Sequence, residues 1–140
     1  MLQFGVCLLV GVAASIEDLW RRRISNLTIV AGLGAGLIAQ VMLCGWWRGA
    51  GIWLAGAAAG FAVFLVFYLA GGMGGGDIKL MAAFGACLGA GQILRAAFFT
   101  AIVGALLACG YLLAGRIRRQ RTDAIPYAPA ILVGTLLSFL

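Results

Sequence analysis

The sequence contains no histidine and few charged side chains. Of its 140 residues only 10% are charged, with four acidic against ten basic residues, whereas 64% are hydrophobic. A soluble domain carries about 25% charged residues, so a chain this poor in charge must present much of its surface to lipid. The composition predicts an integral membrane protein. Because no long polar linker divides it, we expect a single domain over residues 1–140.

Metal and disulfide chemistry are not indicated. The four cysteines, Cys7, Cys44, Cys87 and Cys109, lie within or at the edges of apolar runs, and no two of them form a C-x-x-C pair. Zinc sites and disulfide frameworks depend on cysteine and histidine at characteristic spacings. We therefore expect no metal ion and no cofactor.

The N-terminal apolar run lacks the basic start of a secretory signal. Its cations, Arg21 to Arg23, follow the run, so we expect it to remain as a first span. Five more segments approach the roughly 20 apolar residues that a bilayer core requires. The predicted fold is all-α, a polytopic bundle of about six transmembrane helices. The segments are roughly 2–19, 27–44, 52–70, 78–94, 96–114 and 125–140.

Glycines spaced four residues apart predict that some of these helices approach at backbone distance, because membrane helices pack through small residues. The pairs are Gly32/Gly36, Gly56/Gly60 and Gly85/Gly89.

Basic residues are divided unevenly between the two sides of such a bundle. The regions after the first, third and fifth spans hold Arg21, Arg22, Arg23, Lys79, Arg116, Arg118, Arg119 and Arg121. The other side has only Arg48 and Arg95. Cationic loops tend to remain in the cytoplasm, so we expect both termini outside it. Because the basic residues lie in short gaps between apolar runs, they are better explained as topology signals than as a nucleic-acid site. We expect the protein to be surrounded by lipid.

All acidic residues fall at the predicted cytoplasmic face, and each has a purely structural interpretation. Glu17 and Asp18 would each pair with an arginine four residues later. Asp77 would cap the helix that follows it. Asp123 would be a solvated loop charge or a cap.

A chemical interpretation competes for Asp18 and Asp77. Ionisable groups near membrane depth are costly and usually functional, and the glycines before Asp77 leave room for a substrate backbone. Two converging carboxyl groups share a proton and can activate water. Because Asp77 begins a helix and Asp18 ends one, the macrodipole predicts that Asp77 ionises more readily. Arg21 to Arg23 could reverse this order, and two coupled acids titrate as a pair.

Three stretches resemble the type IV prepilin peptidases, which are intramembrane aspartyl proteases. "GGMGGGDIKLMAAFGACLG" (71–89) resembles their signature, with the G-x-G-D motif at 74–77. "EDLWRRRISN" (17–26) resembles their first aspartate segment, and "IPYAPAILVG" (125–134) is similar to their last-helix motif. One departure is Ser25, where the family usually has proline.

The resemblance implies an aspartic endopeptidase of the bacterial cytoplasmic membrane. It would remove a short basic leader from a prepilin at the cytoplasmic face, cutting after a glycine that precedes an apolar helix. Asp18 and Asp77 would be the catalytic residues. The active-site loop would consist of Gly74, Gly75, Gly76 and Lys79, with Lys79 as an interface anchor or a substrate contact.

Full-size relatives carry an N-terminal extension with paired cysteines, which is not seen here. The chain therefore resembles the short, protease-core-only members of tight-adherence (Flp) pilus systems. We expect no methyltransferase activity, and we expect a prepilin and the pilus assembly machinery as partners.

Two other classes of function stay open at this point. A small proton-coupled transporter would place its acids along a pathway across the membrane. A non-catalytic assembly protein of a pilus or secretion system would keep the fold without activity.

Overall fold

Six α-helices form the part of the chain that the computed structural model describes, which is residues 1–21, 23–69, 74–118 and 127–140. The all-α prediction is confirmed. The helices are α1 (Leu2–Arg21), α2 (Asn26–Cys44), α3 (Trp46–Leu69), α4 (Gly75–Leu88), α5 (Ala90–Arg118) and α6 (Ala128–Leu137).

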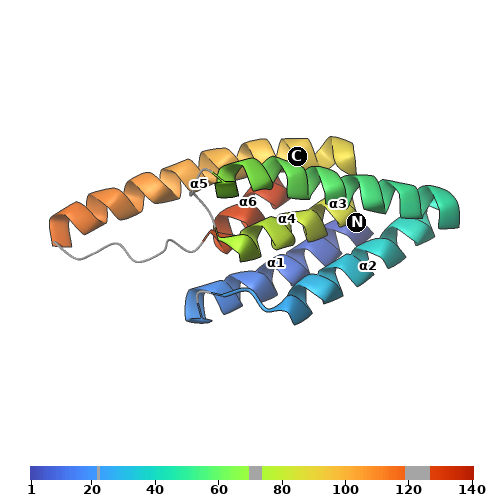
Figure 1. Cartoon of the computed structure of the whole chain (residues 1–140), viewed down its shortest axis with the longest axis horizontal. Coiled ribbons are helices and arrows are strands. Elements are labelled where there is room, and N and C mark those ends of the chain that lie inside the picture. The colour runs from blue at the N-terminus through green and yellow to red at the C-terminus, as the bar shows by residue number, and fades with distance from the viewer. Residues whose placement is uncertain (22, 70–73, 119–126) are drawn as a thin grey trace.

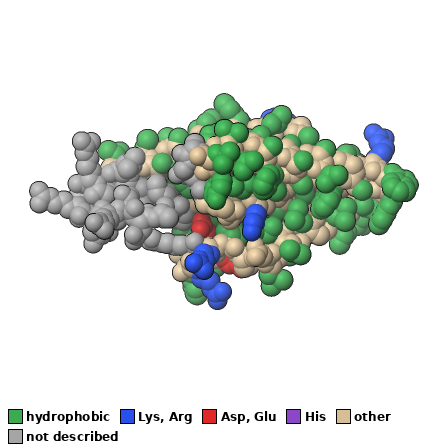
Figure 2. Space-filling model, viewed as in Figure 1, with side chains coloured by type: hydrophobic (Ala, Val, Ile, Leu, Met, Phe, Trp, Pro, Cys, Tyr) green, Lys and Arg blue, Asp and Glu red, His purple; other side chains and the backbone are tan. Residues whose placement is uncertain are grey.

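Four of these helices are long and apolar enough to cross a membrane: α1, α2, α3 and the stretch Ala90–Gly110 of α5. Large hydrophobic side chains are exposed on all four. On the face in Figure 2 they cover much of the surface, and the visible acidic side chains lie near basic ones toward one end. Such a surface fits lipid, and the protein is a polytopic helical membrane protein.

The short helix α4 lies in the middle of the bundle (Figure 1). It contacts each of the other five helices, and most of its residues from Ile78 to Leu88 are buried. At 1.5 Å per residue its 14 residues extend about 21 Å, less than the roughly 30 Å of a bilayer core. On its own, α4 is too short to be the fourth span that the sequence predicts.

The backbones of α3 and α4 touch where Gly56 meets Gly85. A Cβ atom added at either glycine would overlap the carbonyl oxygen of the other. Gly36 of α2 faces α4 as well, because a Cβ there would lie 2.9 Å from the sulfur of Cys87. The predicted close packing at these glycines is confirmed, and it is what allows α2 and α3 to pack so tightly against α4.

The predicted boundary between the fourth and fifth spans, near residue 95, is wrong. Gly89 ends α4 with φ 81° and donates its N–H to the Gly85 oxygen at 2.7 Å. This left-handed conformation suits glycine, which has no Cβ. Consequently α5 begins at Ala90 and contains Arg95.

Two other boundaries also differ from the prediction. Gly45, also at φ 81°, ends α2, so α3 already begins at Trp46 rather than near residue 52. The last helix, Ala128–Leu137, is shorter than the predicted segment 125–140, of which residues 125 and 126 lie outside the described part.

The chain alternates direction, so that α1 and α3 end where α4 and α6 begin (Figure 1). The N-terminus lies toward the opposite end of the bundle. Asp18 is in the last turn of α1 and Asp77 is in the first turn of α4. The fold therefore carries both aspartates to the same end.

Candidate active site

Asp18 and Asp77 line one cavity of about 270 Å³ at this end of the bundle. Both side chains are largely buried, with 8% and 7% of their surface exposed. The other lining residues are Arg23, Ile24, Gly74, Gly75 and Gly76. Two aspartates that are 59 positions apart in the sequence and the predicted glycine segment thus come together, whereas Lys79 does not line this cavity.

The start of α4 fixes the Asp77 side chain. Gly74 is the N-cap residue, and its N–H donates to Oδ2 of Asp77 at 3.2 Å. In return, the N–H of Asp77 donates to the Gly74 oxygen at 3.1 Å. Asp77 therefore helps to cap the helix, as the structural interpretation predicts, but from the third helical position instead of the N-cap.

The surroundings of Asp77 favour its neutral form. Asp77 lies in the first turn of α4, outside the four long apolar helices. The pKa of its carboxyl group is raised from 3.8 to about 6, with burial as the largest cause and the charge of Asp18 as the second, while the hydrogen bond from Gly74 acts in the opposite direction. Near pH 6 about half of the Asp77 side chains therefore hold a proton.

Asp18 meets the beginning of a helix from another part of the chain. Its Oδ2 accepts a hydrogen bond of 3.1 Å from the backbone N–H of Ala128, the first residue of α6. The positive end of the α6 dipole therefore faces this carboxylate and stabilises its negative charge. The macrodipole argument from the sequence considered the helix that carries each acid, so it included neither the burial of Asp77 nor this second helix beside Asp18.

Glu17 does not line this cavity and instead holds the turn between α1 and α2. Its carboxylate accepts hydrogen bonds from the Ser25 N–H at 2.8 Å, the Ser25 hydroxyl at 3.0 Å and the Thr28 hydroxyl at 2.9 Å. Ser25 is also the N-cap of α2, since its Oγ accepts from the Thr28 N–H at 3.2 Å. Among the described residues, no ion pair joins Glu17 to Arg21.

The turn that Glu17 and Ser25 hold contains Arg23 and Ile24, which line the aspartate cavity. Ser25, which the resemblance marks as a departure from proline, thus takes part in this turn through its hydrogen bonds. Its φ of −70° is close to the value that proline would fix.

Of three other residues that the sequence singles out, the structure describes one, Lys79. Lys79 is exposed and donates to Oδ1 of Asn26 at 3.3 Å, so it joins α4 to α2. Arg22, the predicted partner of Asp18, and Asp123 lie outside the described residues. In the described part of the chain, no group of three or more His, Cys, Asp or Glu residues could hold a metal ion.

The contact between Asp18 and Ala128 is the feature that sequence reasoning missed. Pro129, at the start of the last apolar run, is typical of a helix beginning. That signal locates the start of α6, but only the packing of α6 beside α1 brings its first N–H to Asp18.

Comparison with known families gives one match. A model described as the type IV leader peptidase family matches residues 5–109, which include Asp18, Asp77 and all of α4. Comparisons with curated proteins and with solved structures find no match. The family match covers well over half of the chain and confirms the predicted resemblance, although the stretch 125–134 lies beyond it. The chain belongs to the type IV leader peptidase family.

Proposed function

We propose that this protein is an aspartic endopeptidase that removes the leader peptide from prepilins of the Flp type at the cytoplasmic face of the bacterial inner membrane. The observation that carries the proposal is the single cavity into which Asp18 and Asp77 both face, beside three glycines without side chains. An extended peptide can approach such a segment closely, and paired buried carboxyl groups suit hydrolysis through an activated water.

The different surroundings of the two acids support different roles. Asp18, charged and held by Ala128, takes a proton from a water molecule, and the water oxygen attacks the scissile carbonyl carbon. Asp77, neutral, gives its proton to the carbonyl oxygen. When the tetrahedral intermediate collapses, the C–N bond breaks and the leaving nitrogen takes the proton from Asp18. The carbonyl oxygen then returns its proton to Asp77, and both acids recover their starting states.

The position of the cavity supports the substrate class and the membrane face. It lies at the end of the bundle that also carries Arg21 and Arg23, and basic connections favour the cytoplasmic side. A substrate with a basic leader in water and an apolar helix in lipid would present its junction at this depth. Glu17, Asp18 and Asp77 all lie at this one end, so no observation favours a transporter with acids along a transmembrane path.

The proposal can be tested by co-expressing the protein with small prepilins encoded in the same genome and measuring the masses of the mature N-termini. Asp18→Asn and Asp77→Asn are each expected to lower cleavage at least about 100-fold. Asp123→Asn, which changes the remaining aspartate, is the matched control and should cleave normally. Substantial cleavage by either dyad variant would remove the proposed mechanism.

A further inference from the structure

Arg95 lies inside the part of α5 that can cross the membrane, and its side chain is exposed on the outside of the bundle. It is the only charged residue in the apolar stretch Ala90–Gly110. A charged side chain in the hydrocarbon region is costly and usually functional. Arg95 therefore requires an anionic partner at its own depth.

Two contacts fix that depth, and the first joins α5 to α4. Ile93 lies beside Gly85, because a Cβ at Gly85 would be 3.3 Å from Cγ1 of Ile93. Gly85 is eight residues from Asp77, about 12 Å along α4. The two helices run in opposite directions (Figure 1), so Arg95, two residues after Ile93, lies about 3 Å nearer to Asp77. This contact places Arg95 about 9 Å from the level of Asp77.

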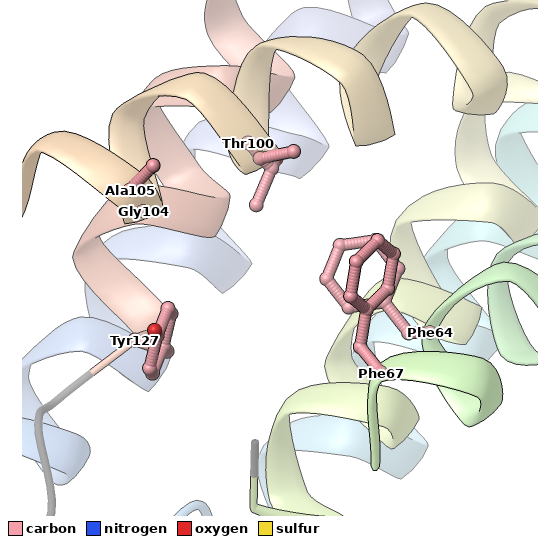
Figure 3. A pocket seen from close by; sticks show the side chains of 7 residues that line it. Phe64, Phe67, Thr100, Gly104, Ala105 and Tyr127 are labelled. Carbon is pink, nitrogen blue, oxygen red and sulfur yellow. The ribbon is translucent and has the colours of Figure 1, made fainter. Parts of the chain in front are cut away.

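The second contact joins α5 to α6 at the level of Asp18. The ring of Tyr127 lies beside Gly104 of α5 (Figure 3), where a Cβ would be 3.0 Å from Cε1 of the ring. Tyr127 directly precedes Ala128, whose N–H donates to Asp18. Arg95 is nine residues before Gly104, about 14 Å along α5. The two contacts together place Arg95 about 9–14 Å from the aspartates, toward the opposite end of the bundle.

No acid in the described part of this chain lies at that depth. Glu17, Asp18 and Asp77 are at the cavity end of the bundle, and each accepts hydrogen bonds from other residues there. A second copy of the protein in the same orientation would add no acid near Arg95 either. The partner must therefore come from another kind of molecule.

Lipid phosphates at the two membrane surfaces are poorly placed to be that partner. Helical side chains lean toward the N-terminus of their helix, which for α5 is the end far from the aspartates, so Arg95 leans away from the nearer surface. On the far side, Trp46 begins α3 ten residues before Gly56, and Gly56 touches Gly85. The far end of α3 is thus about 18 Å from the level of Arg95, farther than one arginine side chain extends.

The exposed face of α5 that carries Arg95 leads to the level of the aspartates. Phe98, Ile102 and Ala105 follow Arg95 at intervals of three or four residues, so they share one face, and all are exposed. Ala105 adjoins Gly104, which lies at the level of Asp18 through its contact with Tyr127. An apolar helix packed on this face would extend from the aspartate level past Arg95.

We propose that Arg95 is a substrate-binding residue that pairs with a carboxylate on the apolar helix of the substrate, about six to nine residues after the cleaved bond. The inference rests on the proposed function. A helix rises about 1.5 Å per residue, so a depth of about 9–14 Å corresponds to this interval. In lipid no water can replace either partner, so the pair selects helices with an acid at that depth and holds them in one register.

Peptide probes test the inference in vesicles of zwitterionic phospholipid that contain the whole protein. Each probe has a basic leader ending in glycine and an apolar segment of about 20 residues, with one glutamate or one glutamine at the third, seventh or fourteenth position after the glycine. At the seventh position we expect kcat/KM for glutamate to exceed that for glutamine at least about tenfold, because close charge pairs at interfaces couple strongly. No such preference is expected at the other two positions. A ratio near one at all three positions, or loss of the preference when anionic lipid is added, would overturn the inference.

Variants of Arg95 assign the preference to this side chain. Arg95→Gln should lose the preference for glutamate, and Arg95→Glu should prefer lysine over glutamine at the seventh position. Because Arg95 is exposed, neither change removes a buried contact. Arg48→Gln, which changes an exposed arginine near the start of α3, is the matched control and should keep the wild-type preference. A preference for glutamate that survives in Arg95→Gln would also overturn the inference.

Binding to Asp77→Asn protein gives a readout that does not depend on turnover, and it separates the two proposals. The glutamate probe should bind at least about tenfold more tightly than the glutamine probe, and adding Arg95→Gln should remove the difference. Equal cleavage of the two probes by wild type, with Asp18→Asn inactive, would overturn the role of Arg95 and leave the peptidase proposal standing. If wild type cleaved no leader-bearing probe while the glutamate probe still bound more tightly through Arg95, the peptidase proposal would fail and the pairing would stand.

Discussion

Replacing Asp77 by asparagine is expected to stabilise the folded protein at neutral pH. Burial, and then the charge of Asp18, raise the pKa of Asp77 from 3.8 to about 6, so its ionised form is less stable in the folded chain than in the unfolded one. A difference of this size corresponds to about 3 kcal/mol. The destabilisation is absent below pH 3.8, grows as the pH rises to about 6 and is complete above that.

The asparagine variant removes the charge and retains a side-chain oxygen that can accept the hydrogen bond from the Gly74 N–H. Thermal unfolding in a mild detergent at about pH 8 and about pH 4 measures the effect. We expect the Tm of Asp77→Asn to exceed that of wild type by about 10 °C at the higher pH and to equal it at the lower pH. Asp123→Asn serves as the control. A variant Tm at pH 8 no higher than that of wild type, or the same gain in Tm at both pH values, would refute the conclusion that ionised Asp77 destabilises the folded protein.

Other parts of the structure predict further results. The kcat/KM of the wild type should fall above about pH 6, because an ionised Asp77 has no proton to give; a profile flat from about pH 5 to 9 would contradict this role. Gly85→Ala should lower the free energy of unfolding by about 3 kcal/mol through overlap with the α3 backbone, whereas Gly51→Ala, in open space, should be neutral or gain up to about 1 kcal/mol. Equal Tm changes for the two would exclude the close contact. Glu17→Ala and Ser25→Ala should each lower the free energy of unfolding by about 1–2 kcal/mol. The double variant should lose less than the sum of the two, because the residues share hydrogen bonds. Additive losses in chemical denaturation would contradict this coupling.

The features that were predictable from the sequence are those encoded by neighbouring residues. The apolar runs predict six helices, and the glycine-rich approach to Asp77 indicates an acid beside exposed backbone. The order of the spans and the uneven distribution of charge predict that Asp18 and Asp77 lie at one end of the bundle. In the structure they line one cavity there. Each of these inferences uses only composition, spacing or the alternation of helices, which a linear sequence contains.

The features that were not predictable depend on conformation or on contacts between distant segments. Gly89 lies in an apolar stretch, and hydropathy does not distinguish a glycine that packs helices from one at φ 81° that ends a helix. The hydrogen bonds of Glu17 to Ser25 and Thr28 require that α1 and α2 fold back on each other. The neighbouring arginine at Arg21 is the simpler partner in the sequence, yet it forms no ion pair with Glu17 in the described structure.

The asymmetry of the two aspartates follows from how each one is held. Asp77 accepts a hydrogen bond from the start of its own helix, but it is carried on α4, which five other helices surround, so burial outweighs that bond. Asp18 accepts its hydrogen bond from α6, and the axis of that second helix adds its dipole to the interaction. Moving α6 would therefore remove the donor and the dipole from Asp18 together, whereas Asp77 would keep the donor on its own helix. The position of α6 thus sets the surroundings of one acid without changing the cap that holds the other.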